Sequence, residues 1–193
     1  MNRFYFSFQT GLFLLFFFCA GVLVPAQSLQ VTSGSNLPYT PQNLISNIFL
    51  GEGVEVTSIT YGGDPDAVGY FNNGTTAVGI ERGIVLTSGV AETSGFSLGC
   101  NEVGSDFAST DHLINTSDVN LQTIATAPLH DLAVYTIKFI PTSDTLRFRY
   151  CFASEEYPEY ACSSFNDVFG FFIQGPGYPT PTNIAKVPGT NLA

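Results

Sequence analysis

Four carboxylates form the densest acidic group in the sequence. Glu155, Glu156 and Glu159 follow an alternating apolar segment, and Asp167 comes just before another. If these two segments are antiparallel neighbours, the four side chains lie at the same end of a sheet. Calcium prefers about six to eight carboxylate and carbonyl oxygens in a flexible loop. The group therefore predicts a structural calcium ion, and the alternative is that these side chains cap turns by accepting hydrogen bonds from backbone N–H groups.

Residues that could support catalysis are sparse. Glu155 and Glu156 are adjacent and point to opposite faces of a strand, so they do not form the paired carboxylates of a glycosidase. The spacing of Glu156 and Asp167 does not exclude them as such a pair. His112 and His130 are the two histidines, and no Gly-x-Ser-x-Gly motif accompanies them. A serine nucleophile activated by histidine is therefore not expected. The histidines and cysteines also lack zinc-site spacing, so the sequence predicts no enzyme.

Aromatic side chains flank the acidic group. Tyr157 and Tyr160 lie within it, and Phe165 and Tyr178 follow. Aromatic rings beside carboxylates form a platform on which a sugar ring can stack, which makes Tyr157 and Tyr160 candidate ligand contacts. The alternative is that these residues form the rim of the core, where tyrosine keeps its hydroxyl group in water.

Three cysteines follow the apolar N-terminal segment. Cys100 and Cys162 lie in loop-like sequence rich in Gly and Ser, whereas Cys151 lies inside an alternating segment. In an oxidising compartment the two loop cysteines are the expected disulfide pair, with Cys151 left over. Three buried thiols are the alternative that spacing leaves open.

Residues 1–26 have the pattern of a secretory signal peptide. Arg3 is the only charged residue before Glu52, and an apolar run from Gly11 to Val24 leads to Pro25 and Ala26. We predict cleavage after Ala26 and export by the Sec route, to the cell surface or the medium. No second apolar run of this length follows, so no membrane span is expected in the mature chain.

The charge balance limits the class of partner. The chain has 16 acidic and six basic residues, which gives a formal net charge of −10. A surface of this sign repels phosphate backbones, so nucleic-acid binding is not expected. It suits cations, although acidity also serves solubility alone.

Short apolar segments separated by turn residues make up the rest of the chain. Residues 27–39 are expected to form an extended lead-in, and Thr40 and Pro41 have the N-cap and first-turn chemistry of a helix. Strands are predicted over residues 54–61, 67–71, 83–87, 133–140, 145–153 and 167–173. The strands at 133–140 and 145–153 are expected to pair as a hairpin. The predicted fold is mainly β, an antiparallel β-sandwich with one short N-terminal helix.

The segment at 145–153 shows the clearest alternation. One face carries four large apolar side chains, and Arg147 and Arg149 lie on the other face. The apolar four are Leu146, Phe148, Tyr150 and Phe152. The last predicted strand likewise places Phe169, Phe171 and Ile173 on one face. Such period-two patterns predict strands with one face against a core.

One stretch of sequence resembles a known family. Residues 148–177 read FRYCFASEEYPEYACSSFNDVFGFFIQGPG and are similar to the signature of the choice-of-anchor L domain; SITYGGDP at 58–65, GYFN at 69–72 and GIVLTSG at 83–89 also resemble that family. The resemblance covers residues 40–193. It implies a domain near the N-terminus of large secreted or surface proteins of bacteria, often exported by type IX secretion. The chain is therefore expected to be part of a longer protein whose domain continues beyond Ala193.

These observations lead to one functional interpretation and one alternative. The chain is expected to be a non-catalytic extracellular module of a modular bacterial surface or secreted protein, adhesion-like or structural. The alternative is a carbohydrate-binding domain, or an accessory to a secreted glycan-degrading enzyme. Surface glycans or other extracellular proteins are the expected partners, and calcium is the only cofactor suggested.

Overall fold

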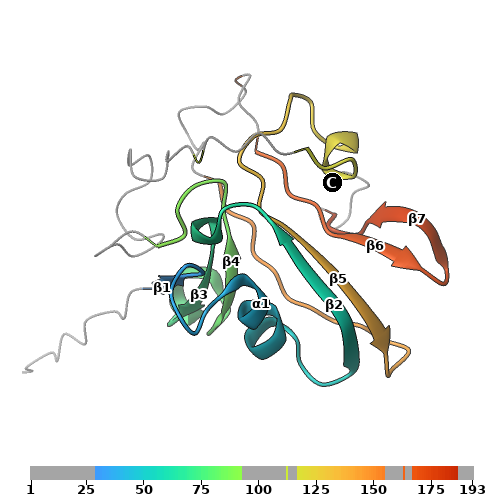
Figure 1. Ribbon diagram of the computed structural model, residues 1–193, viewed down its shortest axis with the longest axis horizontal. Helices are drawn as coiled ribbons and strands as arrows, with labels where there is room; N and C mark the ends of the chain where they lie inside the picture. Colours follow the sequence, from blue (N-terminus) through green and yellow to red (C-terminus); the bar gives the residue numbers. More distant parts are fainter. Residues whose placement is uncertain (1–28, 93–111, 113–116, 155–162, 164–166, 187–193) are drawn as a thin grey trace, which may run out of the picture.

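Antiparallel strands form most of the regular structure in the computed structural model (Figure 1), which describes residues 29–92, 112, 117–154, 163 and 167–186. In that part of the chain the strands form one three-stranded and two two-stranded sheets. Every strand pairing among them is antiparallel. The expected mainly β, antiparallel fold class is confirmed. The predicted signal peptide lies outside the described residues.

The three-stranded sheet consists of β1 (Gln30–Ser33), β3 (Val68–Asn72) and β4 (Gly83–Leu86), with β3 in the centre. β3 and β4 confirm two predicted strands. β1 lies within the expected extended lead-in and pairs with β3, with Val31 opposite Phe71. This partner is distant in sequence, so local signals indicated extended backbone but not membership of a sheet.

A second sheet joins β2 (Val54–Gly62) to β5 (Val134–Pro141), which lie side by side in Figure 1. Ile59 is opposite Ile137 in this ladder. Both strands agree with the sequence, but the expected hairpin of 133–140 with 145–153 is wrong. β5 makes its ladder with β2 along its whole length, and the described residues 145–154 form no strand. That segment packs through its side chains instead, as described below.

One helical segment follows the lead-in, as predicted. It consists of α1 (Pro41–Leu44), continued by a π-helical turn, η1 (Ile45–Phe49). The Thr40 hydroxyl oxygen accepts a hydrogen bond from the Asn43 amide, and Pro41 occupies the first turn, where its missing N–H costs nothing. The sequence pattern indicated the helix and its cap, but not the change to π geometry after Leu44.

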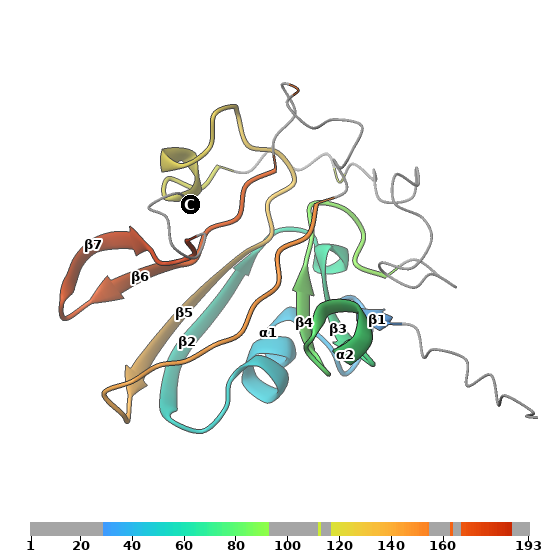
Figure 2. The same cartoon turned by 180° about the vertical axis from the view of Figure 1, so that it is seen from behind.

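The helical segment lies between two sheets, in an arrangement that fits a sandwich (Figure 2). α1 contacts β2 and β3, and η1 contacts β4. Leu44 and Ile45 are 0% and 1% exposed, and Val68 of β3 is fully buried. Apolar side chains of the helix therefore fill the space between the β2–β5 pair and the β1–β3–β4 sheet.

Two tyrosines pack together on the β2–β5 pair, and Tyr135 ties the pair to the helix. The Tyr61 and Tyr135 rings have centroids 4.8 Å apart, and the Tyr135 hydroxyl group donates to the Pro41 carbonyl oxygen at 3.0 Å. The Tyr61 hydroxyl group donates to the Asp64 carbonyl oxygen at 2.7 Å. Burial raises the pKa of both tyrosines above the ordinary value, so both stay neutral donors over the physiological pH range.

The last sheet is a hairpin of β6 (Phe172–Gly175) and β7 (Tyr178–Asn183). The strand predicted at 167–173 is only partly right, because residues 167–171 form no strand. Gly175, Pro176 and Gly177 lie at the turn of this hairpin, where Gly175 is opposite Tyr178. β7 was not predicted, because Pro179 and Pro181 remove ladder donors; a strand with one open edge tolerates them.

The remaining helices are short. η2 (Pro65–Ala67) leads into β3, and α2 (Thr75–Val78) lies between β3 and β4. η4 (Leu121–Thr123) is a single 3-10 turn before β5. Within the described residues, no helix has the length and apolar character needed to cross a bilayer.

The buried helix position gives a direct test of this core. Leu44→Ala is expected to lower the free energy of unfolding by about 2–5 kcal/mol, because it leaves a cavity between the sheets. Leu37→Ala makes the same change at a side chain that is 83% exposed and serves as the control. Denaturant titration followed by circular dichroism measures the difference. Equal stabilities of the two variants would contradict this placement of the core.

Candidate functional site

The candidate site is an open groove between two segments that are distant in sequence. It has a volume of about 840 Å³ and lies between residues 80–82, just before β4, and residues 146–149. Seven residues line it: Ile80, Glu81, Arg82, Leu146, Arg147, Phe148 and Arg149. Three of these are arginines, which are rare in this chain.

Aromatic packing fixes the 145–154 segment in place. The Phe148 ring stacks on Phe171, with centroids 4.1 Å apart and an interplanar angle of 16°. Further along, Tyr150 and Phe152 have ring centroids 5.6 and 6.1 Å from that of Phe169. The order of these contacts shows that residues 148–152 run antiparallel to residues 169–171. The apolar faces predicted from the alternation therefore do meet, although no strand ladder joins them.

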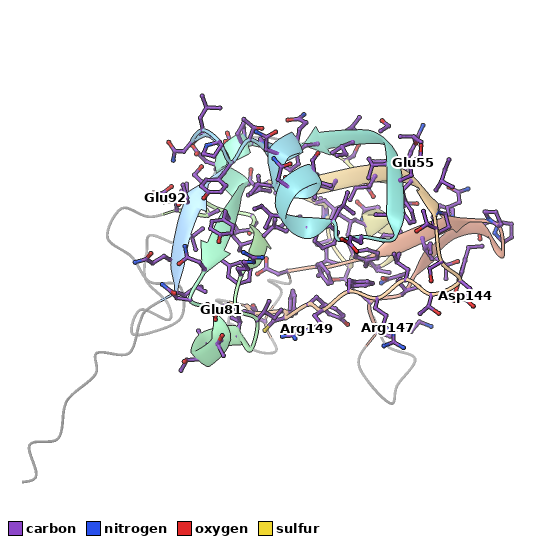
Figure 3. The ribbon with its side chains drawn as sticks, turned by 90° about the horizontal axis from the view of Figure 1, so that it is seen from below. Glu55, Glu81, Glu92, Asp144, Arg147 and Arg149 are labelled. Carbon is purple, nitrogen blue, oxygen red and sulfur yellow. The ribbon has the colours of Figure 1, made fainter. Side chains whose placement is uncertain are left out.

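The same alternation places the arginines on the other side. Arg147 and Arg149 are exposed, and Figure 3 shows both projecting away from the aromatic rings. Because successive side chains of an extended segment point to opposite faces, the packing of Phe148 on Phe171 and of Tyr150 on Phe169 directs Arg147 and Arg149 to the other face. These aromatic contacts, in which Tyr150 stays 45% exposed, thus determine where the two charges lie.

Arg149 also connects this segment to the loop between β3 and β4. Its Nη2 atom donates to the Gly79 carbonyl oxygen at 2.6 Å. Gly79 ends α2 in the left-handed conformation, with φ 70°, where glycine carries no steric cost. This contact holds Gly79 and the adjacent residues 80–82 against the 146–149 segment. It therefore forms one end of the groove.

The carboxylate of the groove is held by a neighbour. The Thr75 hydroxyl group donates to Glu81 Oε2, and the Gly74 amide donates to the Glu81 carbonyl oxygen at 3.0 Å. Both contacts close the loop that contains α2. The Glu81 side chain is therefore engaged within its own loop, and the arginines carry the positive charge of the groove.

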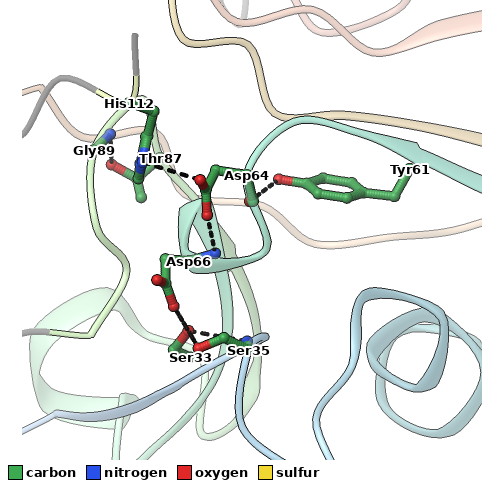
Figure 4. Close-up of polar contacts among 8 residues, drawn as sticks. All are labelled: Ser33, Ser35, Tyr61, Asp64, Asp66, Thr87, Gly89 and His112. Carbon is green, nitrogen blue, oxygen red and sulfur yellow. Dashed lines mark hydrogen bonds and ion pairs between the residues drawn. The ribbon is translucent and has the colours of Figure 1, made fainter. Parts of the chain in front are cut away.

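A separate polar cluster ties β1 to the turn before β3 (Figure 4). The Ser33 and Ser35 hydroxyl groups both donate to Asp66 Oδ1 at 2.5 Å, and the Asp66 amide donates to Asp64 Oδ1 at 2.9 Å. Ser33 is 3% exposed. Hydrogen bonds from Ser33 and then Ser35 hold the pKa of Asp66 below its ordinary value, against an opposing effect of burial.

Two more residues extend this polar cluster. Glu92 Oε2 accepts from the Ser33 amide at 2.5 Å and from Asn36 Nδ2 at 3.0 Å. His112 Nδ1 lies 3.6 Å from Asp64 Oδ2, and the buried Nε2 atom has no hydrogen-bond partner among the described residues. The Asp66 and Glu92 carboxylates thus accept hydrogen bonds from β1 and the residues that follow it. Among the described residues, no three His, Cys, Asp or Glu side chains are grouped in a way that could hold a metal ion.

Most of the candidate site residues predicted from the sequence lie outside the residues that the structure describes. Asp167 is described and exposed. Glu155, Glu156, Glu159, Tyr157 and Tyr160 lie outside the described residues, as do Cys100 and Cys162. Cys151 is a free, exposed thiol. The calcium site, the sugar-contacting tyrosines and the disulfide therefore stay predictions.

The groove was missed from the sequence, although part of its signal was present. Alternation placed Arg147 and Arg149 on the face opposite the aromatic residues. Arginine is rare in this acidic chain, and Arg82, Arg147 and Arg149 share that signal. No local pattern connects Arg82 with the other two, because only the fold bridges their distance in sequence.

The polar cluster predicts a specific dependence of stability on pH. Because the folded pKa of Asp66 is lowered, its contribution is complete above the unfolded value of about 3.9 and is lost as the pH falls through the folded value. Asp66→Asn is expected to cost about 1 kcal/mol near neutral pH and to make the loss of stability in acid shallower. Thermal unfolding between neutral pH and pH 2 measures both effects.

The control removes an exposed carboxylate. Glu55 lies on β2 with its side chain in solvent, so Glu55→Gln is expected to leave the acid dependence as in the unmodified chain. An acid dependence of Asp66→Asn identical to that of the unmodified chain would contradict the role of the serine hydrogen bonds.

Comparison with known proteins gives one match. A family model described as the choice-of-anchor L domain matches residues 31–193, which is nearly the whole chain and begins within β1. No curated protein and no solved structure matches the chain.

Proposed function

This chain belongs to the choice-of-anchor L domain family, and we propose that it acts as a non-catalytic module of a larger secreted or surface protein, adhesion-like or structural. The family is one of surface-anchoring or extracellular modules. The match over residues 31–193 is the observation that carries the proposal. It agrees with the resemblance noted from the sequence and covers all the described strands except the first residue of β1.

The charge and packing of the domain support an extracellular role. A formal net charge of −10 keeps an exported domain soluble and separate from its neighbours. The polar cluster holds β1 and the turn at residues 64–66 by hydrogen bonds to carboxylates, which are stronger than bonds between neutral groups. A domain of this kind is suited to presenting a binding surface rather than to chemistry.

Export provides the first test. The chain produced in a Gram-negative host is expected to be exported from the cytoplasm with Gln27 as its first residue. Mass spectrometry of the exported protein identifies that residue. Ala26→Arg places a large charged side chain at the cleavage position and is expected to block processing. Gln27→Arg makes the same change one residue later and serves as the control. A processed Ala26→Arg chain, or retention of the unmodified chain in the cytoplasm, would contradict the proposal.

Carbohydrate binding is the second candidate function. Tyr150 and Phe152 are 45% and 55% exposed, and they lead directly into the segment that carries Tyr157 and Tyr160. Large exposed aromatic residues in such a row offer apolar faces to sugar rings. This observation favours the candidate without naming the sugar.

A glycan array separates the two candidates. Specific binding that is lost in Tyr157→Ala and in Tyr160→Ala is expected if these aromatic residues contact a sugar. Tyr39→Ala, at a tyrosine that stacks on Tyr70 near β1, is the control for a general loss of an aromatic side chain. Absence of specific binding by the unmodified chain would leave the adhesion-like or structural role as the proposal.

A further inference from the structure

The groove between residues 80–82 and 146–149 gathers positive charge on an acidic chain. Of the six Lys and Arg residues in the sequence, Arg82, Arg147 and Arg149 line this groove. All three side chains are exposed. Glu81 is the one carboxylate among the lining residues, so the groove has a net positive charge while the chain as a whole carries −10.

The guanidinium groups retain free donors. Arg149 uses Nη2 for the Gly79 carbonyl oxygen, which leaves its other N–H groups available. Within the described part of the chain, no carboxylate lies within ion-pair distance of Arg82, Arg147 or Arg149. Glu81 accepts from Thr75. Three positively charged groups that have no acidic partner among the described residues repel one another, so a bound anion would relieve that repulsion.

The spacing of the two neighbouring arginines suits separate carboxylates. Residues two apart on an extended segment lie on the same side, about 6.6 Å from each other. Each guanidinium has a planar fork of N–H donors that matches the two oxygens of a carboxylate. Arg147 and Arg149 can therefore bind successive acidic groups of one ligand.

Three apolar side chains also line the groove. They are Ile80, Leu146 and Phe148, and Leu146 is 47% exposed. A sugar ring presents a face of C–H groups that packs on such side chains. An extended peptide would place backbone N–H and C=O groups there, and apolar side chains cannot form hydrogen bonds with them.

We propose that this groove binds an acidic oligosaccharide, with Arg147 and Arg149 pairing with carboxylates of successive uronate residues and Arg82 binding from the opposite wall. The groove volume of about 840 Å³ accommodates a short segment of such a chain. The inference rests on the extracellular setting proposed above and adds a site and a ligand class to it. The negative charge outside the groove favours short ligands over long polyanions.

Isothermal titration of the purified full chain with short oligogalacturonates tests the inference. The matched ligand is the methyl-esterified oligomer, which keeps the sugar and removes the charge. We expect binding of the acid form that weakens with added salt, and binding of the ester that is at least about tenfold weaker.

Protein variants locate the site. Arg147→Ala with Arg149→Ala is expected to weaken binding by about tenfold or more, since each removes a charged hydrogen-bond donor. Lys138→Ala with Lys186→Ala causes the same change in net charge at exposed positions outside the groove and is expected to bind as the unmodified chain does. Arg147→Ala alone removes no hydrogen bond or ion pair within the described residues and is the variant to use if the double change impairs folding. Circular dichroism checks the fold of each.

Several results would overturn the inference. They are no binding of the acid form, equal binding of the ester, unchanged binding by the folded arginine variants, or tighter binding of a poly-glutamate peptide. The last result would assign the groove to an acidic protein partner. None of them bears on export or on Tyr157 and Tyr160, so a chain that is exported but does not bind uronates refutes this inference and leaves the proposed function intact.

Discussion

Burial of the helical segment between two sheets is the interaction on which the rest of the described structure depends. The two-stranded β2–β5 pair has too few strands to be stable alone in water, and the three-stranded β1–β3–β4 sheet would leave an apolar face exposed without the helix. Leu44 and Ile45 fill the space between them and are almost fully buried. The Tyr135 hydroxyl bond to the Pro41 carbonyl oxygen adds a directional link between β5 and the start of α1. One short helix therefore joins strands that have no hydrogen bonds to each other.

A second constraint, the alternation of residues 146–152, couples the interior to the surface. Phe148 and Tyr150 can pack against Phe171 and Phe169 only if the intervening Arg149 faces outward. The hydrogen bond from Arg149 to Gly79 then joins this segment to the loop that follows β3. The positions of Arg147 and Arg149 in the groove thus follow from the aromatic contacts of this segment.

The acidic residues around β1 and the acidic residue of the groove have different roles in the described structure. Around β1, Asp66 and Glu92 accept hydrogen bonds from serine, asparagine and backbone groups, so their charge is used within the fold. Around the groove, positive charge is left without carboxylate partners in the described residues. This asymmetry, rather than the net charge, distinguishes the surface proposed to meet a ligand from the surface that keeps the domain soluble. Membership of a family of extracellular modules makes a binding surface of this kind a reasonable use of the fold.

Local signals in the sequence were sufficient for several of the elements. Thr40 and Pro41 specify a helix start through groups that lie within one turn. Alternation indicates β2 and β5, and a short continuous apolar run indicates β4. The same alternation separated the aromatic face of residues 146–152 from Arg147 and Arg149.

Only the tertiary structure decided which segments meet. β5 pairs with β2 rather than with the neighbouring 145–153 segment, β1 joins a sheet across a distance in sequence, and β7 forms despite Pro179 and Pro181. The approach of Arg82 to Arg147 and Arg149 likewise arises from the fold. A period of two shows that a segment has one buried face, but any strand of suitable length can supply the partner. The choice among partners is made by the total burial and hydrogen bonding of the folded chain, which no single segment contains.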